Sequence, residues 1–519
     1  MGHGHVRTPD LPICSETALY AGCRGQPGEG SQRRCGWNRP VNARRSAKGE
    51  ESGEELHVTA EDLRELIATL NHYCLHAGTE RFKKEQGVDS LPEDFFATTP
   101  PEVLREFFRC INWSYKEAQL IIVHHRLRLE AARRANNLEI EVPYSFKFMI
   151  GLLTDYADTI GWAMLQGDLS WVRAQFLDVR GHSDLAHHNW ESVETILTDF
   201  NKDPDQIMLA TDLTSFLQVG DVFLRNTATG QTTRFEIKAG HENERVLKVL
   251  SATSTKEFEQ RMAQYVGSSK DRQHAMKQLE RNLKQHLRMA GSSKYIDSGR
   301  TERVDLKTDQ PVIVHETDIL EESWSGVVRE LAQGLGEVDA ATGTIDGCLF
   351  FEYGTGPHTV SRDLYFRYRV SKQLGLGLEE AALRRLLVLD VAQATAMPGF
   401  VPQSTNLLQL GEDRQSRLLA LDDYLVVYLH VPGLSSLAAA SGASLKIRNM
   451  RSADEPYRDP LIRNLFGNNK VACITFEQQI HGEFNLAGGL VGRVLLNFLA
   501  PRSIFRMASD AKPEAPDSR

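Results

Sequence analysis

Cysteine is scarce in this sequence of 519 residues, and the seven cysteines form no CxxC pair. An odd, scattered set predicts no disulfide framework. Cys14, Cys23 and Cys35 share the N-terminal region with His3 and His5, but their spacing fits no known zinc-ligand pattern. We therefore expect the cysteines to be free thiols.

Long apolar runs are missing as well. The stretch from Tyr424 to Val431 is among the most apolar, and it is far shorter than the roughly 20 residues that span a bilayer. The opening residues also lack the apolar segment of a secretory signal. Both absences favour a cytoplasmic protein without a membrane partner.

The sequence contains no GxxxxGK[ST] loop for nucleotide phosphates. Energy-driven translocation along a substrate would therefore need another subunit. The formal net charge of −9 argues against a surface built entirely to bind nucleic acid. It leaves room for a local basic groove, which is what phosphate contacts require.

The length and the apolar content of 41% predict two or three domains. Residues 1–55 are rich in Gly, Arg, Ser and Glu, and we expect a disordered head there. A helical region is predicted over 56–180, a core of short strands and helices over 181–300, and a second α/β domain over 305–505. A flexible polar tail is expected over 506–519.

Local patterns predict individual elements in these regions. A helix is expected to begin at the capping sequence from Thr59 to Asp62. His124 and His125 lie in an apolar helical run, and a buried or half-exposed structural role fits them better than metal ligation. Further elements are expected as helices over 189–200 and 379–389 and as strands over 348–353, 444–447 and 471–476.

The most informative segment is a predicted β-hairpin. Two β-type segments, residues 219–225 and 232–238, flank a turn-forming run over 226–230. The pattern places Asp221 and Glu236 on adjacent antiparallel strands. Side chains alternate along a strand, so Glu236 and Lys238 are expected on the face opposite to Phe235 and Ile237.

These charged groups suit the hydrolysis of phosphodiester bonds. Carboxylates hold a hard cation through oxygen, the cation polarises phosphate and acidifies water, and a nearby ammonium steadies developing charge. Asp221 and Glu236 are the predicted ligands of Mg²⁺ or Mn²⁺. The backbone carbonyl of Ile237 is a further candidate ligand, and Lys238 is the predicted catalytic cation.

The segment resembles the core hairpin of the restriction-endonuclease-like, or PD-(D/E)xK, nuclease superfamily. In that superfamily an Asp, often preceded by Gly, stands ahead of a strand that ends in Glu-x-Lys. Gly220-Asp221 and Glu236-Ile237-Lys238 match in type, order and spacing, although the first Pro of the pattern is absent. The resemblance covers about residues 185–290 and implies an α/β fold with a mixed sheet flanked by helices.

The resemblance also implies an acidic residue on a preceding helix. Glu194 and, one turn earlier, Glu191 are the candidates, and Glu194 is preferred. Asp212 is a third acid nearby, but its sequence setting suits a local turn or cap better than a metal ligand.

Members of the superfamily follow the Lys strand with a helix that contacts the scissile strand. The implied nucleic-acid-binding residues are Gln260, Gln264, Tyr265, Arg272, Gln273, Lys277, Arg281 and Lys284. Basic side chains in this stretch could grip phosphates along a groove. A solvated helix face with lysines turned to water is an equally good interpretation.

The sequence thus predicts a magnesium-dependent endonuclease acting on nucleic acid, with DNA as the expected substrate and restriction, phage defence or repair as its setting. Two alternatives stay open beside a structural Glu236–Lys238 surface pair. One is a nuclease-fold module that binds nucleic acid without cleaving it. The other is a partner-regulated interaction protein, and a homodimer or a partner protein would fit either.

Overall fold

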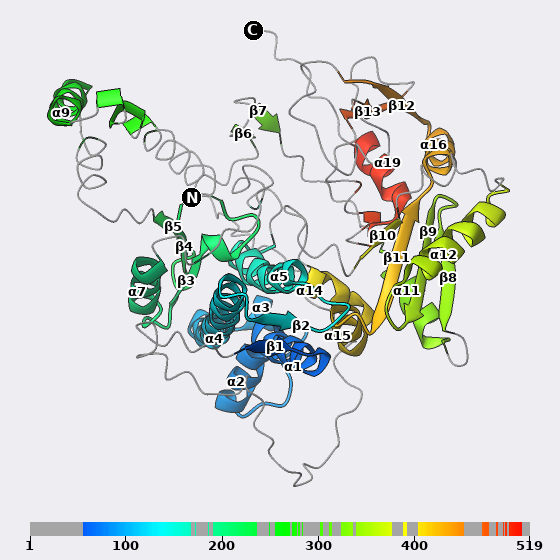
Figure 1. Ribbon diagram of the computed structural model, residues 1–519, viewed down its shortest axis with the longest axis horizontal. Coiled ribbons are helices and arrows are strands. Elements are labelled where there is room, and N and C mark those ends of the chain that lie inside the picture. The colour runs from blue at the N-terminus through cyan, green and yellow to red at the C-terminus, as the bar shows by residue number, and fades with distance from the viewer. Residues whose placement is uncertain are drawn as a thin grey trace. The chain divides into compact units, whose positions relative to one another are not determined.

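The computed structural model describes the chain in several stretches (Figure 1). They are residues 55–167, 190–218, 220–235, 255–269, 323–335, 339–375, 403–450, 470–476 and 498–510, with shorter pieces at 272–283, 302–304, 311–313, 388–391, 484–485 and 491–495 and single residues between them.

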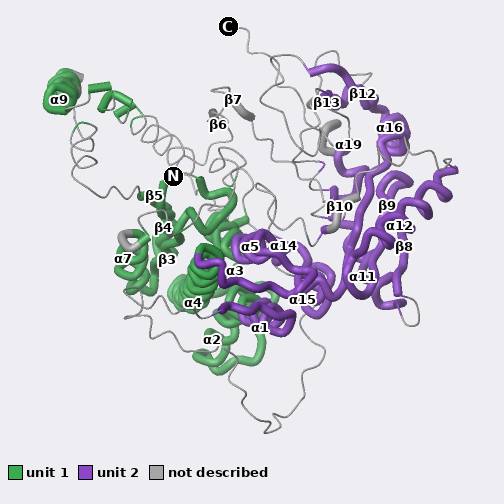
Figure 2. Tube along the Cα trace, viewed as in Figure 1, with its two compact units in different colours: residues 1–13, 70–134, 156–314 green, residues 14–69, 135–155, 315–519 purple. Residues whose placement is uncertain are grey.

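The described residues pack into two units (Figure 2). Unit 1 takes its residues from Leu70–Arg134 and Tyr156–Val314, and unit 2 takes its own from Cys14–Thr69, Ala135–Asp155 and His315–Arg519. The predicted helical region over 56–180 therefore contributes to both units. The predicted head, residues 1–55, lies outside the described residues except for Glu55.

Unit 1 combines helices with a small antiparallel sheet in the order β3-β4-β5. Phe82, Phe95 and Phe107 form an aromatic cluster between its first helices, with ring centroids 5.3 to 5.7 Å apart. Its main elements are α2 (Ala77–Gln86), α3 (Phe95–Thr98), α4 (Pro101–Arg134), α7 (Trp190–Phe200), β3 (Gln206–Ala210), β4 (Val222–Asn226), β5 (Thr232–Phe235), α9 (Thr255–Ser268), β6 (Glu302–Val304) and β7 (Pro311–Ile313).

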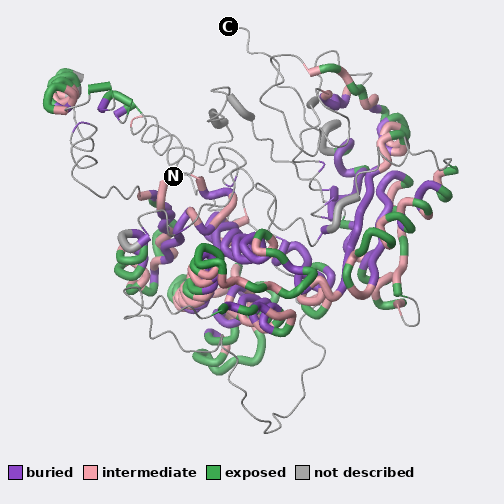
Figure 3. The backbone as a smooth tube through the Cα atoms, in the orientation of Figure 1, coloured by how far each residue is buried: buried purple, intermediate pink, exposed green. Residues whose placement is uncertain are grey.

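Unit 2 is built on a four-stranded antiparallel sheet in the order β10-β11-β9-β8 and a second sheet in the order β12-β13-β14. Strand β11 is buried along its whole length (Figure 3), as its continuous apolar run requires. The strands are β8 (Ala340–Ile345), β9 (Leu349–Thr355), β10 (Val388–Asp390), β11 (Asp423–Leu429), β12 (Ala443–Asn449), β13 (Lys470–Phe476) and β14 (Phe484–Asn485).

The helices of unit 2 cover these sheets. On one face of the first sheet, Phe366 and Val370 of α12 pack against Phe350, Tyr424 and Tyr428. The helices are α11 (Ser325–Gln333), α12 (Val360–Gln373), α14 (Gln403–Asn406), α15 (Glu412–Leu419), α16 (Val431–Ala440) and α19 (Pro501–Asp510).

Residues on both sides of α4 in the sequence also belong to unit 2. Strands β1 (Leu56–Val58) and β2 (Leu138–Ile140) pair in parallel, and α1 (Ala60–Asn71) follows β1. The predicted helix start is confirmed, because Thr59 and Asp62 cap it reciprocally: Asp62 N–H donates to Thr59 Oγ1 at 3.2 Å, and Thr59 N–H donates to Asp62 Oδ2 at 2.9 Å.

Most of the predicted local elements are present. The strands expected over 348–353, 444–447 and 471–476 are β9, β12 and β13, and the helix expected over 189–200 is α7. The helix expected over 379–389 is wrong at its end, because Val388–Asp390 form strand β10 against β11; residues 379–387 lie outside the described residues.

The predicted tail begins inside a helix. α19 runs to Asp510, and Ile504 and Phe505, just before Arg506, are buried in the core with almost no exposure. Residues 511–519 lie outside the described residues, so the flexibility of the tail stays a prediction. The chain as described is a mixed α/β structure. Within its described part, no helix combines the length and the apolar character that a membrane crossing needs.

The cysteine and histidine expectations hold for most of the positions that are described. Cys74, Cys110, Cys348 and Cys473 are buried and form no disulfide. His125 is buried, and burial lowers its pKa to about 3, so it is a neutral core residue. Its neighbour His124 is exposed, which the sequence did not predict.

A buried carboxylate of unit 2 is hydrogen-bonded to the start of α14. Asp155 lies near the middle of α5 (Phe146–Met164), and its two carboxylate oxygens accept hydrogen bonds of 2.7 Å from the backbone N–H groups of Gln403 and Ser404. These are N–H groups that the first turn of α14 leaves without a helical partner. Burial nevertheless raises the pKa of Asp155 to about 6.

We expect Asp155 to make the stability of the protein depend on pH. Because its folded-state pKa lies above the unfolded value of about 3.9, the folded state binds more protons between these values, and stability falls as the pH rises from about 4 to 6. Denaturant unfolding of the wild type and of Asp155→Asn at several pH values measures this. The difference in unfolding free energy between the two proteins should change by about 1–3 kcal/mol across that window. A difference that is the same at pH 4 and pH 7 would contradict the assignment.

Candidate metal and nucleic-acid site

The predicted hairpin is present. Strands β4 and β5 pair antiparallel from Val222 opposite Phe235 to Arg225 opposite Thr232. The Asn226 side chain closes the turn by accepting hydrogen bonds from the N–H groups of Ala228 and Thr229, at 3.0 and 3.1 Å. Gly230 has a φ of +72°, a conformation that favours glycine.

Asp221 stands at the start of the central strand of this sheet. Its N–H donates to the carbonyl of Phe235 at 2.9 Å, and its carbonyl accepts from the N–H of Thr211 at 3.0 Å. Because Phe235 is also the register partner of Val222, two consecutive residues stand opposite one, which is the arrangement of a β-bulge. The half-exposed Asp221 is thus hydrogen-bonded through its backbone to β5 on one side and to the turn that follows β3 on the other.

The two faces of the hairpin pack against different partners. Phe223 and Arg234 oppose each other in the register, and the buried guanidinium of Arg234 lies 5.3 Å from the ring centroid of Phe223. Phe235 alternates to the other face, where its ring contacts Phe200 of α7 at 5.4 Å. This contact agrees with the expectation that Phe235 points into packed protein.

Polar side chains along one side of α4 support β3, the strand next to the hairpin. This polar stripe consists of Arg105, Arg109, Asn112, Lys116, Gln119 and Arg126. Gln119 is buried; its amide nitrogen donates to the carbonyl of Met208 at 3.0 Å, and its oxygen accepts from the N–H of Ala210 at 3.1 Å. Asn201 extends this pairing, because its oxygen accepts from the N–H of Met208 at 2.8 Å. Side-chain amides thereby take the place of a neighbouring strand along the open edge of β3.

The same stripe holds the turns at both ends of the sheet. Asn112 donates 2.9 Å hydrogen bonds to the carbonyl of Pro204 and to the hydroxyl of Thr227 in the hairpin turn. At the far end, the buried guanidinium of Arg126 donates to the carbonyl of Asp212 at 2.7 Å. The helix therefore contacts the sheet at both ends.

Charge is neutralised where the stripe begins. Arg105 and Arg109 both donate to the Asp205 carboxylate, with Nε to Oδ1 distances of 3.0 and 2.8 Å, and they hold its pKa well below its usual range. Two turns beyond Arg109, Lys116 donates to the carbonyl of Asp203 at 2.7 Å, and burial lowers its pKa to about 8.

The structure describes only part of the predicted metal site. Glu236, Ile237 and Lys238 lie outside the described residues, as does the side chain of Glu191. Glu194 is an exposed residue of α7. Among the side chains that are described, no group of three or more His, Cys, Asp and Glu could hold a metal ion.

Asp212 behaves as the sequence predicted. It lies in the 3₁₀ turn Thr211–Leu213, directly after β3. Its backbone carbonyl is the acceptor for Arg126. This confirms its place in a local turn.

Most of the predicted nucleic-acid-binding residues that are described are exposed. Gln260 and Gln264 lie on α9, and Arg272, Gln273 and Lys277 lie in the helical pieces that follow. Arg281 and Lys284 lie outside the described residues.

Tyr265 differs from these neighbours. It is 4% exposed and packs with Val249, Ala275 and Leu279 in a small core cluster. Its ring is therefore occupied by packing, and the exposed side chains around it are the ones that can meet a ligand.

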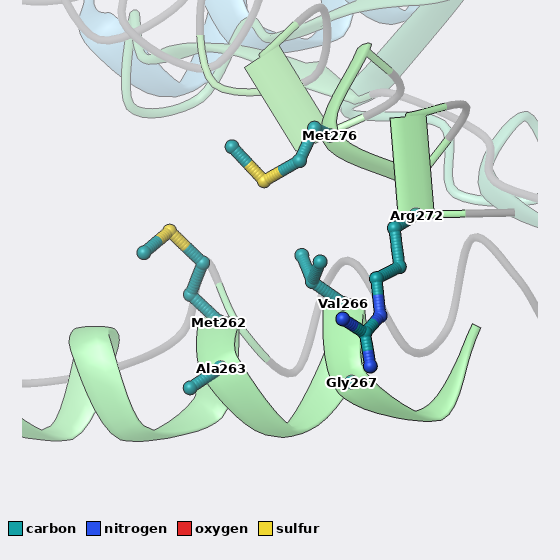
Figure 4. A pocket seen from close by; sticks show the side chains of 6 residues that line it. All are labelled: Met262, Ala263, Val266, Gly267, Arg272 and Met276. Carbon is teal, nitrogen blue, oxygen red and sulfur yellow. The ribbon is translucent and has the colours of Figure 1, made fainter.

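A groove of about 310 Å³ lies between α9 and the following helical pieces (Figure 4). Met262 and Met276 point toward each other from its opposite sides, and Arg272 stands at one end. Ala263, Val266 and Gly267 complete the lining. The groove thus combines an apolar floor with one cation.

Sequence reasoning missed the polar stripe of α4 and the bulge at Asp221. Both left signals. The stripe residues recur at spacings of three, four and seven, which place them on one side of a helix. Gly220, with a φ of +88°, is the kind of glycine that marks a bulge beside a strand.

Comparison with known proteins adds no relative. No protein-family model, no curated protein and no solved structure matches this chain.

Removing the amide of Gln119 tests the support of the hairpin sheet. We expect Gln119→Leu to lower the free energy of unfolding by about 1–3 kcal/mol, because it leaves the buried N–H of Ala210 without its side-chain acceptor, while the Met208 carbonyl keeps only the Asn201 amide as a donor. Denaturant unfolding measures the change. Leu120→Gln, at the exposed neighbouring position, is the matched control and should stay within about 0.5 kcal/mol of the wild type. Equal stability of the two variants would show that the hydrogen bonds of the Gln119 amide do not stabilise the sheet.

Proposed function

We propose that the protein is a metal-dependent nuclease that hydrolyses phosphodiester bonds in DNA. In this proposal Asp221 and Glu236 bind Mg²⁺ or Mn²⁺ with the carbonyl of Ile237, and Lys238 is the catalytic cation. The core would then have the restriction-endonuclease-like fold. Restriction, phage defence or repair would be its setting.

The hairpin carries the proposal. Asp221 is fixed by backbone hydrogen bonds opposite Phe235, and Glu236 is the next residue in the sequence. If β5 continues beyond Phe235, Glu236 would follow on the strand next to Asp221. Two carboxylates brought close together would repel each other unless a cation neutralised them, so a divalent ion is the expected occupant of such a pair.

The residues fit a hard cation in their chemistry. Oxygen ligands from carboxylates and a backbone carbonyl are those that Mg²⁺ and Mn²⁺ favour. When bound, such an ion polarises the scissile phosphate and lowers the pKa of a water molecule. Asp221 is half-exposed at a bulge, a feature that often redirects a side chain beside an active site.

Lys238 and Glu194 have separate roles in this proposal. Lys238 follows Glu236 by two residues, and its ammonium would orient the attacking water or steady the charge that develops on the phosphate. Glu194 would add a further carboxylate from α7. That helix packs on the hairpin through Phe200 and Phe235.

The exposed polar residues after the hairpin support binding of a polyanion. Arg272, Gln273 and Lys277 are all exposed, beside a groove with an apolar floor. The same observation favours a second candidate function, a module that binds nucleic acid without cleaving it. The two candidates differ in metal-dependent cleavage.

The decisive measurement is cleavage of plasmid and single-stranded DNA by the full chain with Mg²⁺ or Mn²⁺. We expect metal-dependent cleavage that falls at least about 100-fold in Asp221→Asn, Glu236→Gln and Lys238→Ala, since each removes a ligand or the catalytic cation. Asp199→Asn is the matched control, because Asp199 is an exposed acid of α7 that pairs with Lys202 at 2.7 Å; it should cleave like the wild type. An intact protein that binds DNA but never cleaves it would favour the non-catalytic candidate.

Salt dependence of binding tests the basic surface. With catalysis blocked by Asp221→Asn, we expect each of Arg272→Ala and Lys277→Ala to reduce the slope of log K against log salt concentration by about 1, because each removes one phosphate contact. Fluorescence anisotropy with labelled DNA gives the slope. Lys202→Ala removes an exposed lysine that already pairs with Asp199 and should leave the slope unchanged. If all three variants behave alike, the surface after the hairpin does not bind phosphates.

A further inference from the structure

Strand β8 forms an edge of the first sheet of unit 2. Within the described residues it pairs with β9 alone. Its sequence from Ala340 to Ile345 is AATGTI, without a charged residue or a proline. Proteins usually protect a sheet edge with charge, proline or a covering segment, because its backbone groups can pair with another strand. This edge carries neither of the first two protections.

The hydrogen-bond pattern shows which residues face outward. The carbonyl of Asp339 accepts from the N–H of Thr355 at 2.9 Å, so Asp339 belongs to a hydrogen-bonded pair with β9. In an antiparallel ladder these pairs alternate along the strand. The backbone N–H and C=O groups of Ala340, Thr342 and Thr344 therefore point away from β9.

We propose that β8 pairs antiparallel with β8 of a second copy of this chain. The three outward residues are symmetric about Thr342, so a two-fold axis beside Thr342 would pair Thr342 with its own copy. The same axis would pair Ala340 with the other copy's residue 344, and Thr344 with residue 340. Every outward donor would then meet an outward acceptor, as an isologous interface requires.

The surface around β8 supports a second copy as the occupant. Identical strands placed side by side bring identical charges together, and β8 carries none. Thr342 and Thr344 are exposed. They lie on the sheet face that α12 covers, because Phe350, the register partner of Thr344, belongs to the core beneath that helix. The side chains of the strand on that face, those of Ala340, Thr342 and Thr344, are all small.

The helices that flank this sheet add apolar surface. Ten large hydrophobic side chains are exposed among the described residues, and five of them lie on the two helices that pack against this sheet. One is Val327 of α11, and the others are Val360, Leu364, Tyr365 and Tyr368 of α12. A six-residue edge is only about 20 Å long. The area that such an edge alone can bury is too small for a stable dimer, whose interface buries about 1,600 Å². Helix surfaces on both faces of the extended sheet would supply the remainder.

The glycine of the strand fits the same arrangement. A Cβ on Gly343 would come within 2.4 Å of the Phe351 ring and 2.9 Å of Leu331 of α11. The other face of β8 is thus closed by packing in unit 2. The outward edge is what β8 offers to a partner.

The test is the oligomeric state of the full chain, measured by sedimentation velocity over a wide concentration range. The wild type should form a concentration-dependent dimer, and Thr342→Pro should abolish it, because proline removes an outward N–H that does not take part in the pairing with β9. Circular dichroism and thermal unfolding check that the variant keeps its fold. A wild type that is monomeric at every concentration, or a dimer untouched by this proline, would overturn the proposal.

A charge swap tests the two-fold axis itself. Thr342→Lys and Thr342→Glu should each weaken the dimer about fivefold, because like charges face each other across the axis, and an equimolar mixture should restore it. Thr233→Lys, at an exposed threonine of β5, is the matched control and should dimerise like the wild type. If the mixture is as weak as each variant alone, Thr342 does not face its own copy. This test does not depend on nuclease activity.

Discussion

The contact on which unit 1 depends is the one between the polar stripe of α4 and the edge of β3. A three-stranded sheet has two edges, and an edge buried against a helix would leave its N–H and C=O groups without partners. Gln119, with Asn201, supplies those partners with side-chain amides, while Asn112 and Arg126 hold the turns at either end. These hydrogen bonds hold the sheet in a fixed position on α4. Asp221, at the start of the central strand, is held with it.

Rigidity of this kind matters for the proposed chemistry. A metal site requires its ligands to keep their geometry before the cation arrives, which is easier on paired strands than on a loop. Asp221 is tied by backbone bonds to Thr211 and Phe235, and Phe235 is itself packed against Phe200. The residues that stabilise the sheet would thus also hold the metal ligand Asp221 in place. Substitutions in the stripe on α4 are therefore expected to shift Asp221 by moving the backbone of β3 and the turn that follows it.

In unit 2 the buried polar groups that need partners include acidic side chains. Its central strands β9 and β11 are buried between helices, and buried acids are matched by donors from both strands and helices: Tyr424 donates to Glu352 at 2.7 Å, and Arg417 donates to Asp423 at 2.7 and 2.9 Å. Each buried charge has a partner, as burial requires. Among the described strands, β8 is an edge of this sheet, and the proposed second copy would pair there.

The sequence by itself determined the hairpin, the helix start at Thr59, α7, and three strands of unit 2, because each rests on local periodicity, capping or turn chemistry. Tertiary structure alone decided the rest. Val388 belongs to strand β10, which pairs with β11, although its local pattern predicted a helix. Tyr265 is buried in a small core, although its neighbours in the sequence are exposed. The bulge at Asp221 and the stripe on α4 arise from hydrogen bonds between residues far apart in the chain, and no local pattern encodes which backbone carbonyl a glutamine will meet.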